Sequence, residues 1–129
     1  MDKVSYWLNI ADDDVSVARL LLKGKKYLHL GFFCHLITEK ALKAVVESVT
    51  QETPPKIHDL KKLAKYGKIF DDLSQEQHDL LMDLTPFQMD ARYPEYKTSI
   101  AQTLNAGKCK QMLKETEEFL CWVKKKLGK

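Results

Sequence analysis

Apolar residues recur at helical spacing along most of this chain of 129 residues, and nowhere do apolar and polar residues alternate over a useful length. A half-buried strand needs such alternation, so the pattern favours an all-helical fold. The residues that break helices are few and lie between the periodic segments: Gly24, Gly31, Pro54, Pro55, Gly67, Pro86 and Pro94. There is no repeat, low-complexity tract or linker, and residues 1–129 are therefore predicted to form one domain.

The spacing predicts helices over residues 3–23, 27–49, 57–66, 74–84 and 97–127. Signals at the ends support these ranges. Gly24 is a typical residue after the last turn of a helix, and Ser74-x-x-Gln77 is typical of a capping box at the start of one. Because short loops join three long helices, we expect an antiparallel up-and-down bundle of four to five helices.

The charge balance is only mildly basic. There are 21 Lys and Arg against 18 Asp and Glu, and only Arg19 and Arg92 are arginines. This scarcity of arginine counts against a dedicated DNA-binding protein, although lysines near the C-terminus allow weak, unspecific attraction of RNA. No apolar run approaches the ~20 residues of a membrane span and no signal peptide precedes the first helix, so we expect a cytoplasmic protein without membrane contact.

The cysteines and histidines show no metal-binding pattern. Cys34, Cys109 and Cys121 lie among apolar neighbours in helical segments, which predicts reduced thiols that behave as small hydrophobic residues. No H-x₃₋₅-H or C-x₂-C spacing occurs, nor any glycine-rich phosphate-binding loop. We therefore predict neither a metal nor a cofactor.

The predicted apolar stripe of the first helix comprises Trp7, Ile10, Ala11, Val17, Ala18, Leu21 and Leu22. Asp14 falls at the centre of this stripe, one turn from Ala11 and from Ala18. A carboxylate in such a place must be paired or hydrogen-bonded. Two interpretations stay open: a structural ion pair inside the bundle, or a functional carboxylate in a polar site. In both, the expected partner is a basic residue on a facing helix.

The second helix is apolar nearly all round. One face carries Leu30, Phe33, Cys34, Ile37, Ala41, Ala44 and Val45, and the other carries Phe32, Leu36, Leu42 and Val46 with His35, Glu39 and Lys43. A helix of this kind is either central or faces another subunit, and in so small a bundle we expect a symmetric homodimer through it. Glu39 and Lys43 form an i,i+4 pair. Together with Lys40, these residues belong either to an ordinary charged surface or to a functional site.

Two further positions have alternative interpretations. His58 precedes Asp59 at the start of the third helix, where Asp59 suits the helix dipole and His58 is either a capping residue or a general acid or base. Arg92-Tyr93-Pro94 interrupts the helical pattern. Arg92 either pairs with Asp14 or Glu39, or binds a phosphate through its planar guanidinium group.

Taken in order, these residues resemble the HEPN family, named for higher eukaryotes and prokaryotes nucleotide-binding. The motifs are Trp7-x-x-x-Ala11-x-x-Asp14-x-x-x-Ala18-x-x-Leu21, Phe32-Phe33, Glu39-Lys40-Ala41-Leu42-Lys43, His58-Asp59-Leu60 and Arg92-Tyr93-Pro94. The resemblance extends from about Tyr6 to Leu127. It implies a bundle of four or five helices, usually dimeric, related to the helical domain of kanamycin nucleotidyltransferase.

The resemblance also implies partners and a chemistry. Small HEPN proteins are often encoded with a minimal nucleotidyltransferase, as two-component or toxin–antitoxin pairs. Many are metal-independent ribonucleases that use an arginine followed, four to six residues later, by a histidine. Neither Arg19 nor Arg92 has a histidine at that offset.

The resulting hypothesis is a non-enzymatic, dimeric nucleotide-binding module that acts with such a nucleotidyltransferase. Its expected ligand-binding residues are Asp14, Glu39, Lys40, Lys43, His58 and Arg92. One alternative is a ribonuclease toxin that uses His58 with Arg92 as catalytic residues. Another is a structural scaffold in which the same residues form only an internal network of salt bridges.

Overall fold

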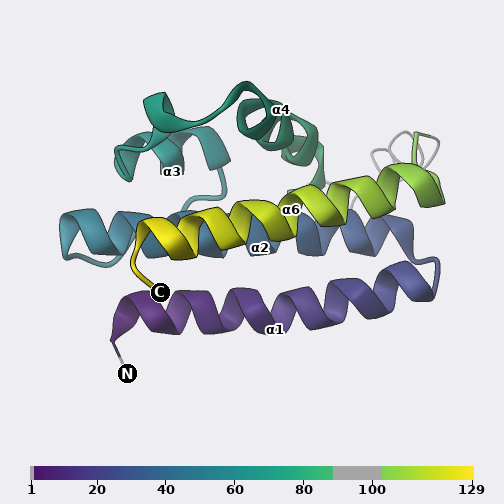
Figure 1. The fold of residues 1–129 in the computed structure, drawn as a ribbon, viewed down its shortest axis with the longest axis horizontal. Coiled ribbons are helices and arrows are strands. Elements are labelled where there is room, and N and C mark those ends of the chain that lie inside the picture. Colours follow the sequence, from purple (N-terminus) through teal and green to yellow (C-terminus); the bar gives the residue numbers. More distant parts are fainter. Residues whose placement is uncertain (1, 89–102) are drawn as a thin grey trace.

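The regular elements of the chain are all helical in the computed structural model, which describes residues 2–88 and 103–129. They are α1 (Lys3–Lys23), α2 (Tyr27–Thr50), α3 (Leu60–Tyr66), the 3₁₀ turn η1 (Phe70–Asp72), α4 (Gln75–Leu84), the 3₁₀ turn η2 (Thr85–Phe87) and α6 (Ala106–Lys126). The long helix α1 lies antiparallel to α2 and to α6, and the short helices α3 and α4 return the chain between α2 and α6 (Figure 1). The predicted all-helical bundle is confirmed.

Side-chain caps set most of the helix starts. Asp2 accepts a hydrogen bond from the Ser5 amide, and Ser74 and Gln77 form the predicted capping box. The third predicted helix begins three residues late, at Leu60, because Asp59 caps it. The last one begins at Ala106 rather than at 97, because Asn105 is its cap and accepts a hydrogen bond from the Lys108 amide.

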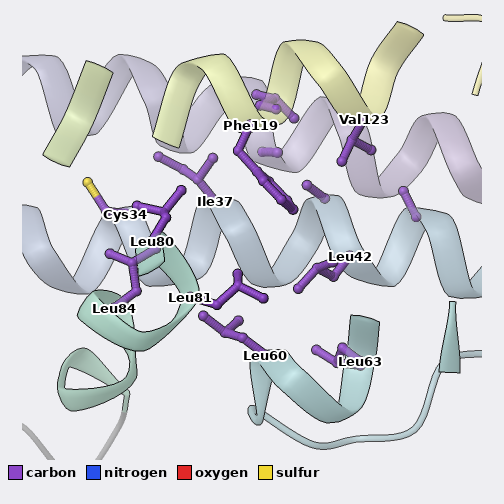
Figure 2. Close-up of a cluster of buried hydrophobic side chains, with 14 of the residues drawn as sticks. Cys34, Ile37, Leu42, Leu60, Leu63, Leu80, Leu81, Leu84, Phe119 and Val123 are labelled. Atoms are coloured by element: carbon purple, nitrogen blue, oxygen red, sulfur yellow. The ribbon is translucent and has the colours of Figure 1, made fainter. Parts of the chain in front are cut away.

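The second helix is the centre of the bundle. Fourteen of its residues are buried, and α1, α3, α4 and α6 contact it from different sides. Figure 2 shows Ile37 and Leu42 of α2 between Phe119 of α6 and Leu60 of α3. The argument that its second apolar face requires another subunit is therefore wrong, because elements of the same chain cover that face.

The buried face of α1 differs from the predicted stripe. The structure buries Leu8, Ala11, Val15 and Ala18, while Val17 is 37% exposed. The expectation that Asp14 lies at the centre of the stripe is therefore wrong, because Asp14 is half-buried beside the core face. Cys34 and Cys109 are buried as expected, whereas Cys121 is exposed on α6.

Ion pairs tie the two ends of the chain together. Lys124 of α6 contacts Asp12 of α1 at 2.6 Å, and Arg19 of α1 pairs with Glu117 of α6 about two helical turns away. From the first pair to the second, the residue number rises by seven on α1 and falls by seven on α6. The two helices are therefore antiparallel. Among the residues described, no helix has the length and hydrophobicity of a bilayer-spanning segment.

Gly31 provides a test of this packing. A Cβ at this position would lie 2.3 Å from the buried Phe87 ring. Alanine gains about 1 kcal/mol of helix propensity over glycine, but forcing the ring aside costs about 1–3 kcal/mol. We expect Gly31→Ala to lower the free energy of unfolding by up to about 2 kcal/mol in urea denaturation.

Gly107→Ala is the matched control. A Cβ at this exposed site in α6 would meet only the side-chain Oδ1 of Asn105, at 3.4 Å. It should leave stability unchanged or raise it by less than about 1 kcal/mol. A Gly31→Ala protein more stable than the wild type would contradict the close contact with Phe87.

Candidate functional site

The carboxylate of Glu39 is the centre of a polar cluster inside the bundle. Glu39 is only 1% exposed and lies midway along α2. Its Oε2 accepts a hydrogen bond from Lys43 Nζ at 3.1 Å, and its Oε1 accepts one from His58 Nδ1 at 3.0 Å. His35 Nδ1 and Lys40 Nζ each lie 3.7 Å from the carboxylate. We call His35, Glu39, Lys40, Lys43 and His58 the Glu39 cluster.

Local structure explains how these side chains meet. His35 and Lys43 precede and follow Glu39 by four residues, so the three lie on one face of α2. His58 comes from the segment between α2 and α3, immediately before the N-cap Asp59. Because Asp59 caps α3 through the Lys62 amide, the expectation that His58 is a capping residue is wrong, and its ring instead reaches the Glu39 carboxylate.

Helix α1 covers the cluster with an aromatic ring. Lys40 and Lys43 place their Nζ atoms 5.5 and 5.6 Å from the centre of the Trp7 ring, within the range of cation–π attraction. The Trp7 indole nitrogen is buried without a hydrogen-bond partner among the residues that the structure describes. The two lysines nearest to the Glu39 carboxylate thus also lie close to one aromatic ring of α1.

Charge and burial oppose each other at Glu39. Burial alone would raise the pKa of its carboxyl, but the hydrogen bond from His58 and the charge of Lys43 outweigh burial and lower that pKa. Burial lowers the pKa of His35 despite the nearby carboxylate. Near neutral pH the cluster therefore contains an ionised Glu39 and a neutral His35.

Asp14 lies beside this cluster on α1. Burial raises the pKa of its carboxyl, and the positive charge of Lys40 partly opposes that effect. Lys40 is on the facing helix α2, where the basic partner was expected. The two groups interact through space, since Asp14 forms no ion pair within 4.0 Å in the described parts of the chain.

The outer edge of the cluster is accessible. The side chains of His58, Lys40 and Lys43 are 47%, 21% and 8% exposed. A pocket of about 330 Å³ adjoins His58 and is also lined by Asp59, Lys61, Thr85 and Gln88. A small molecule in this pocket would contact the half-exposed imidazole, whose Nε2 has no hydrogen-bond partner among the described residues.

The structure brings together four of the six predicted site residues, Glu39, Lys40, Lys43 and His58, with Asp14 at the margin. Arg92, in Arg92-Tyr93-Pro94, lies outside the described residues. Sequence reasoning missed His35 and Trp7 as members of the site. The four-residue spacing to Glu39 could have identified His35, whereas Trp7 was assigned to the core because an indole on an apolar stripe gives no other signal.

The arrangement suits two kinds of chemistry. First, two lysines around one carboxylate leave a net positive charge beside a pocket, and this charge can bind an anion. Second, a histidine whose Nδ1 is hydrogen-bonded to a buried carboxylate can exchange protons through Nε2. Within residues 2–88 and 103–129, no three His, Cys, Asp or Glu side chains are placed to ligate one metal ion.

Comparison with known proteins gives one family. The sequence profile described as HEPN domain matches residues 4–126, nearly the whole chain. No curated protein and no solved structure matches the chain significantly.

The pKa shifts predict how stability depends on pH. The lowered pKa of folded His35 means that the unfolded chain takes up this proton first as pH falls below the ordinary value of 6.5. The lowered pKa of Glu39 has the same effect below 4.5. We expect the free energy of unfolding to fall with decreasing pH, first through His35 and then also through Glu39.

Urea denaturation between pH 7.5 and about 5.5 measures the first part. His35→Gln removes one titrating group and should flatten the slope of the unfolding free energy against pH. His29→Gln, at an exposed position of α2, is the matched control and should keep the wild-type slope. Equal slopes in wild type and His35→Gln would contradict the assignment of a neutral, buried His35.

Proposed function

The chain belongs to the HEPN domain family, and we propose that it is a dimeric nucleotide-binding module acting with a minimal nucleotidyltransferase. The nucleotide would bind at the Glu39 cluster through its phosphate groups. The partner enzyme, the two-component or toxin–antitoxin pairing and the homodimer come from the family resemblance and are part of the proposal.

The observation that supports this proposal most strongly is the buried Glu39 carboxylate with two lysines and two histidines around it. One negative charge is set against two permanent positive charges. Lys43 and His58 are hydrogen-bonded to the carboxylate, which holds them in place before a ligand arrives. A preorganised cationic site needs little rearrangement to bind a phosphate.

The exposed members define where a phosphate would bind. Lys40 hydrogen-bonds to no described residue and contacts Glu39 only at 3.7 Å, so its ammonium group can turn to an anion. His58 lines the pocket, and its Nε2 has no hydrogen-bond partner among the described residues. In the proposal, Asp14 and Glu39 orient the cations, and Arg92 adds a bidentate phosphate contact.

In the proposed homodimer the buried faces of α2 are not the interface, since helices of the same chain cover them. The part-buried residues of α2 beside the site, such as Leu36, are the surface that remains. A dimer joined there would bring two Glu39 clusters near each other.

Calorimetry with ATP and GTP tests nucleotide binding. We expect micromolar affinity and, for Lys40→Gln, a loss of about tenfold to a hundredfold, because one charge-assisted hydrogen bond contributes about 1.5–3 kcal/mol. Lys62→Gln removes an equal charge from an exposed site on α3 and should bind like the wild type. Absence of binding to either nucleotide, or equal losses in both variants, would refute the proposal.

One observation favours a second candidate, a metal-independent ribonuclease. Nδ1 of His58 is held by a buried carboxylate and the half-exposed imidazole lines a pocket, which suits a general base that acts through Nε2. Nε2 would accept the proton of a ribose 2′-hydroxyl as the 2′-oxygen attacks phosphorus. The bond to the 5′-oxygen then breaks, the imidazolium returns the proton to that oxygen, and a 2′,3′-cyclic phosphate remains.

Incubating the purified protein with RNA in EDTA tests this candidate. If His58 is the base, cleavage occurs without metal and His58→Ala abolishes it, because no other group takes the proton of the 2′-hydroxyl in this mechanism. His78→Ala, on α4 outside the cluster, is the matched control and should keep full activity. No cleavage by the wild type, or cleavage that survives His58→Ala, eliminates the mechanism.

A further inference from the structure

An open groove of about 940 Å³ runs between α1 and α6 and is lined by none of the residues of the Glu39 cluster. Arg19 and Leu22 form its α1 side, and α6 lines it from Gly107 to Lys125. At 1.5 Å per residue, that stretch of α6 is about 27 Å long, or five helical turns. The groove therefore has the length of a helix of about 18 residues.

The groove is apolar at its base and basic at its edge. Leu22, Leu113 and Trp122 line it with apolar surface and pack against the core. Lys110, Lys114 and Lys125 lie on one face of α6, are exposed, and form no ion pair with a described residue. Arg19 is already paired with Glu117, so Glu118 is the one remaining acidic residue among those that line the groove.

We propose that this groove is the docking site for an acidic amphipathic helix of a partner protein. An apolar stripe on that helix would cover the partly exposed Leu22 and Trp122, and acidic residues beside the stripe would meet the three lysines. This is the helix-in-groove mode of recognition, with charge deciding which helices bind. The proposal is independent of nucleotide binding at the Glu39 cluster.

Other occupants fit the groove less well. Single-stranded RNA would satisfy the lysines, but RNA-binding grooves stack successive bases on aromatic rings, and Trp122 is the one aromatic residue among those lining the groove. A second copy of the chain placed symmetrically would bring another three lysines against the first three. An acidic helix satisfies both the charge and the aliphatic surface.

The exposed thiol of Cys121, which lines the groove, provides the readout. The probe is a synthetic peptide of about 18 residues with leucines at helical i, i+3, i+4 and i+7 spacing and glutamates on both sides of that stripe. We expect the peptide to slow alkylation of Cys121 by iodoacetamide in a saturable manner at micromolar concentration. Cys34 and Cys109 are buried and do not compete for the reagent.

The double variant Lys110→Glu/Lys114→Glu should weaken protection about tenfold or more, because each change replaces an attraction by a repulsion. Lys56→Glu/Lys62→Glu is the matched control, because it changes the net charge equally at exposed positions outside the groove. In this variant the peptide should protect Cys121 as well as it does in the wild type. Circular dichroism confirms that both variants remain helical.

The proposal is wrong if the peptide gives no protection at millimolar concentration, or if a peptide with lysines in place of the glutamates protects Cys121 equally well. It is also wrong if both double variants weaken protection equally. Protection of Cys121 by single-stranded RNA but not by the peptide would likewise overturn it. A fall in molecular mass in solution upon Lys110→Glu/Lys114→Glu would also overturn it, since a second copy of the chain would then occupy the groove.

Discussion

A carboxylate in the middle of the central helix is the constraint on which the rest of this structure depends. Glu39 has almost no access to water, and an ionised carboxylate in such a place is stable only when cations and hydrogen bonds replace its hydration. One helical turn supplies Lys43, and the segment before α3 supplies His58. The position of that segment, and hence the start of α3, is thus linked to the charge of one side chain.

The same requirement extends to α1. Lys40 and Lys43 both lie within cation–π distance of the Trp7 ring, whose face attracts positive charge. Buried ion pairs of this kind add little net stability compared with an apolar core, because desolvation offsets most of the attraction. Apolar contacts around α2 therefore supply most of the stabilisation, and the Glu39 cluster connects α2 to Trp7 of α1 and to His58 before α3.

Much of this fold could be predicted from the sequence because its helix ends carry local signals. Ser74 and Asp59 mark helix starts by the bonds that their own side chains make, and such bonds reach no further than three residues. The start of α6 was placed too early because the preceding residues have no strong helix breaker, and Asn105 decided the boundary. The buried face of α1 was misplaced because apolar residues occur on several sides of that helix. The Glu39–Lys43 pair follows from spacing alone, but the contact of His58 with Glu39, nineteen positions apart, depends on the path of a loop that no periodicity describes.

The ion pairs between α1 and α6 have a consequence for the order of assembly. Asp12 and Lys124 are 112 positions apart, and Asp2 meets Lys129 at the opposite end of the chain. Helices α1 and α2 can form a hairpin as soon as both have been synthesised, but one side of that hairpin stays uncovered until α6 arrives. During translation the α6-facing surface of α2 is therefore uncovered from the completion of α2 at Thr50 until α6 has been made at Lys126.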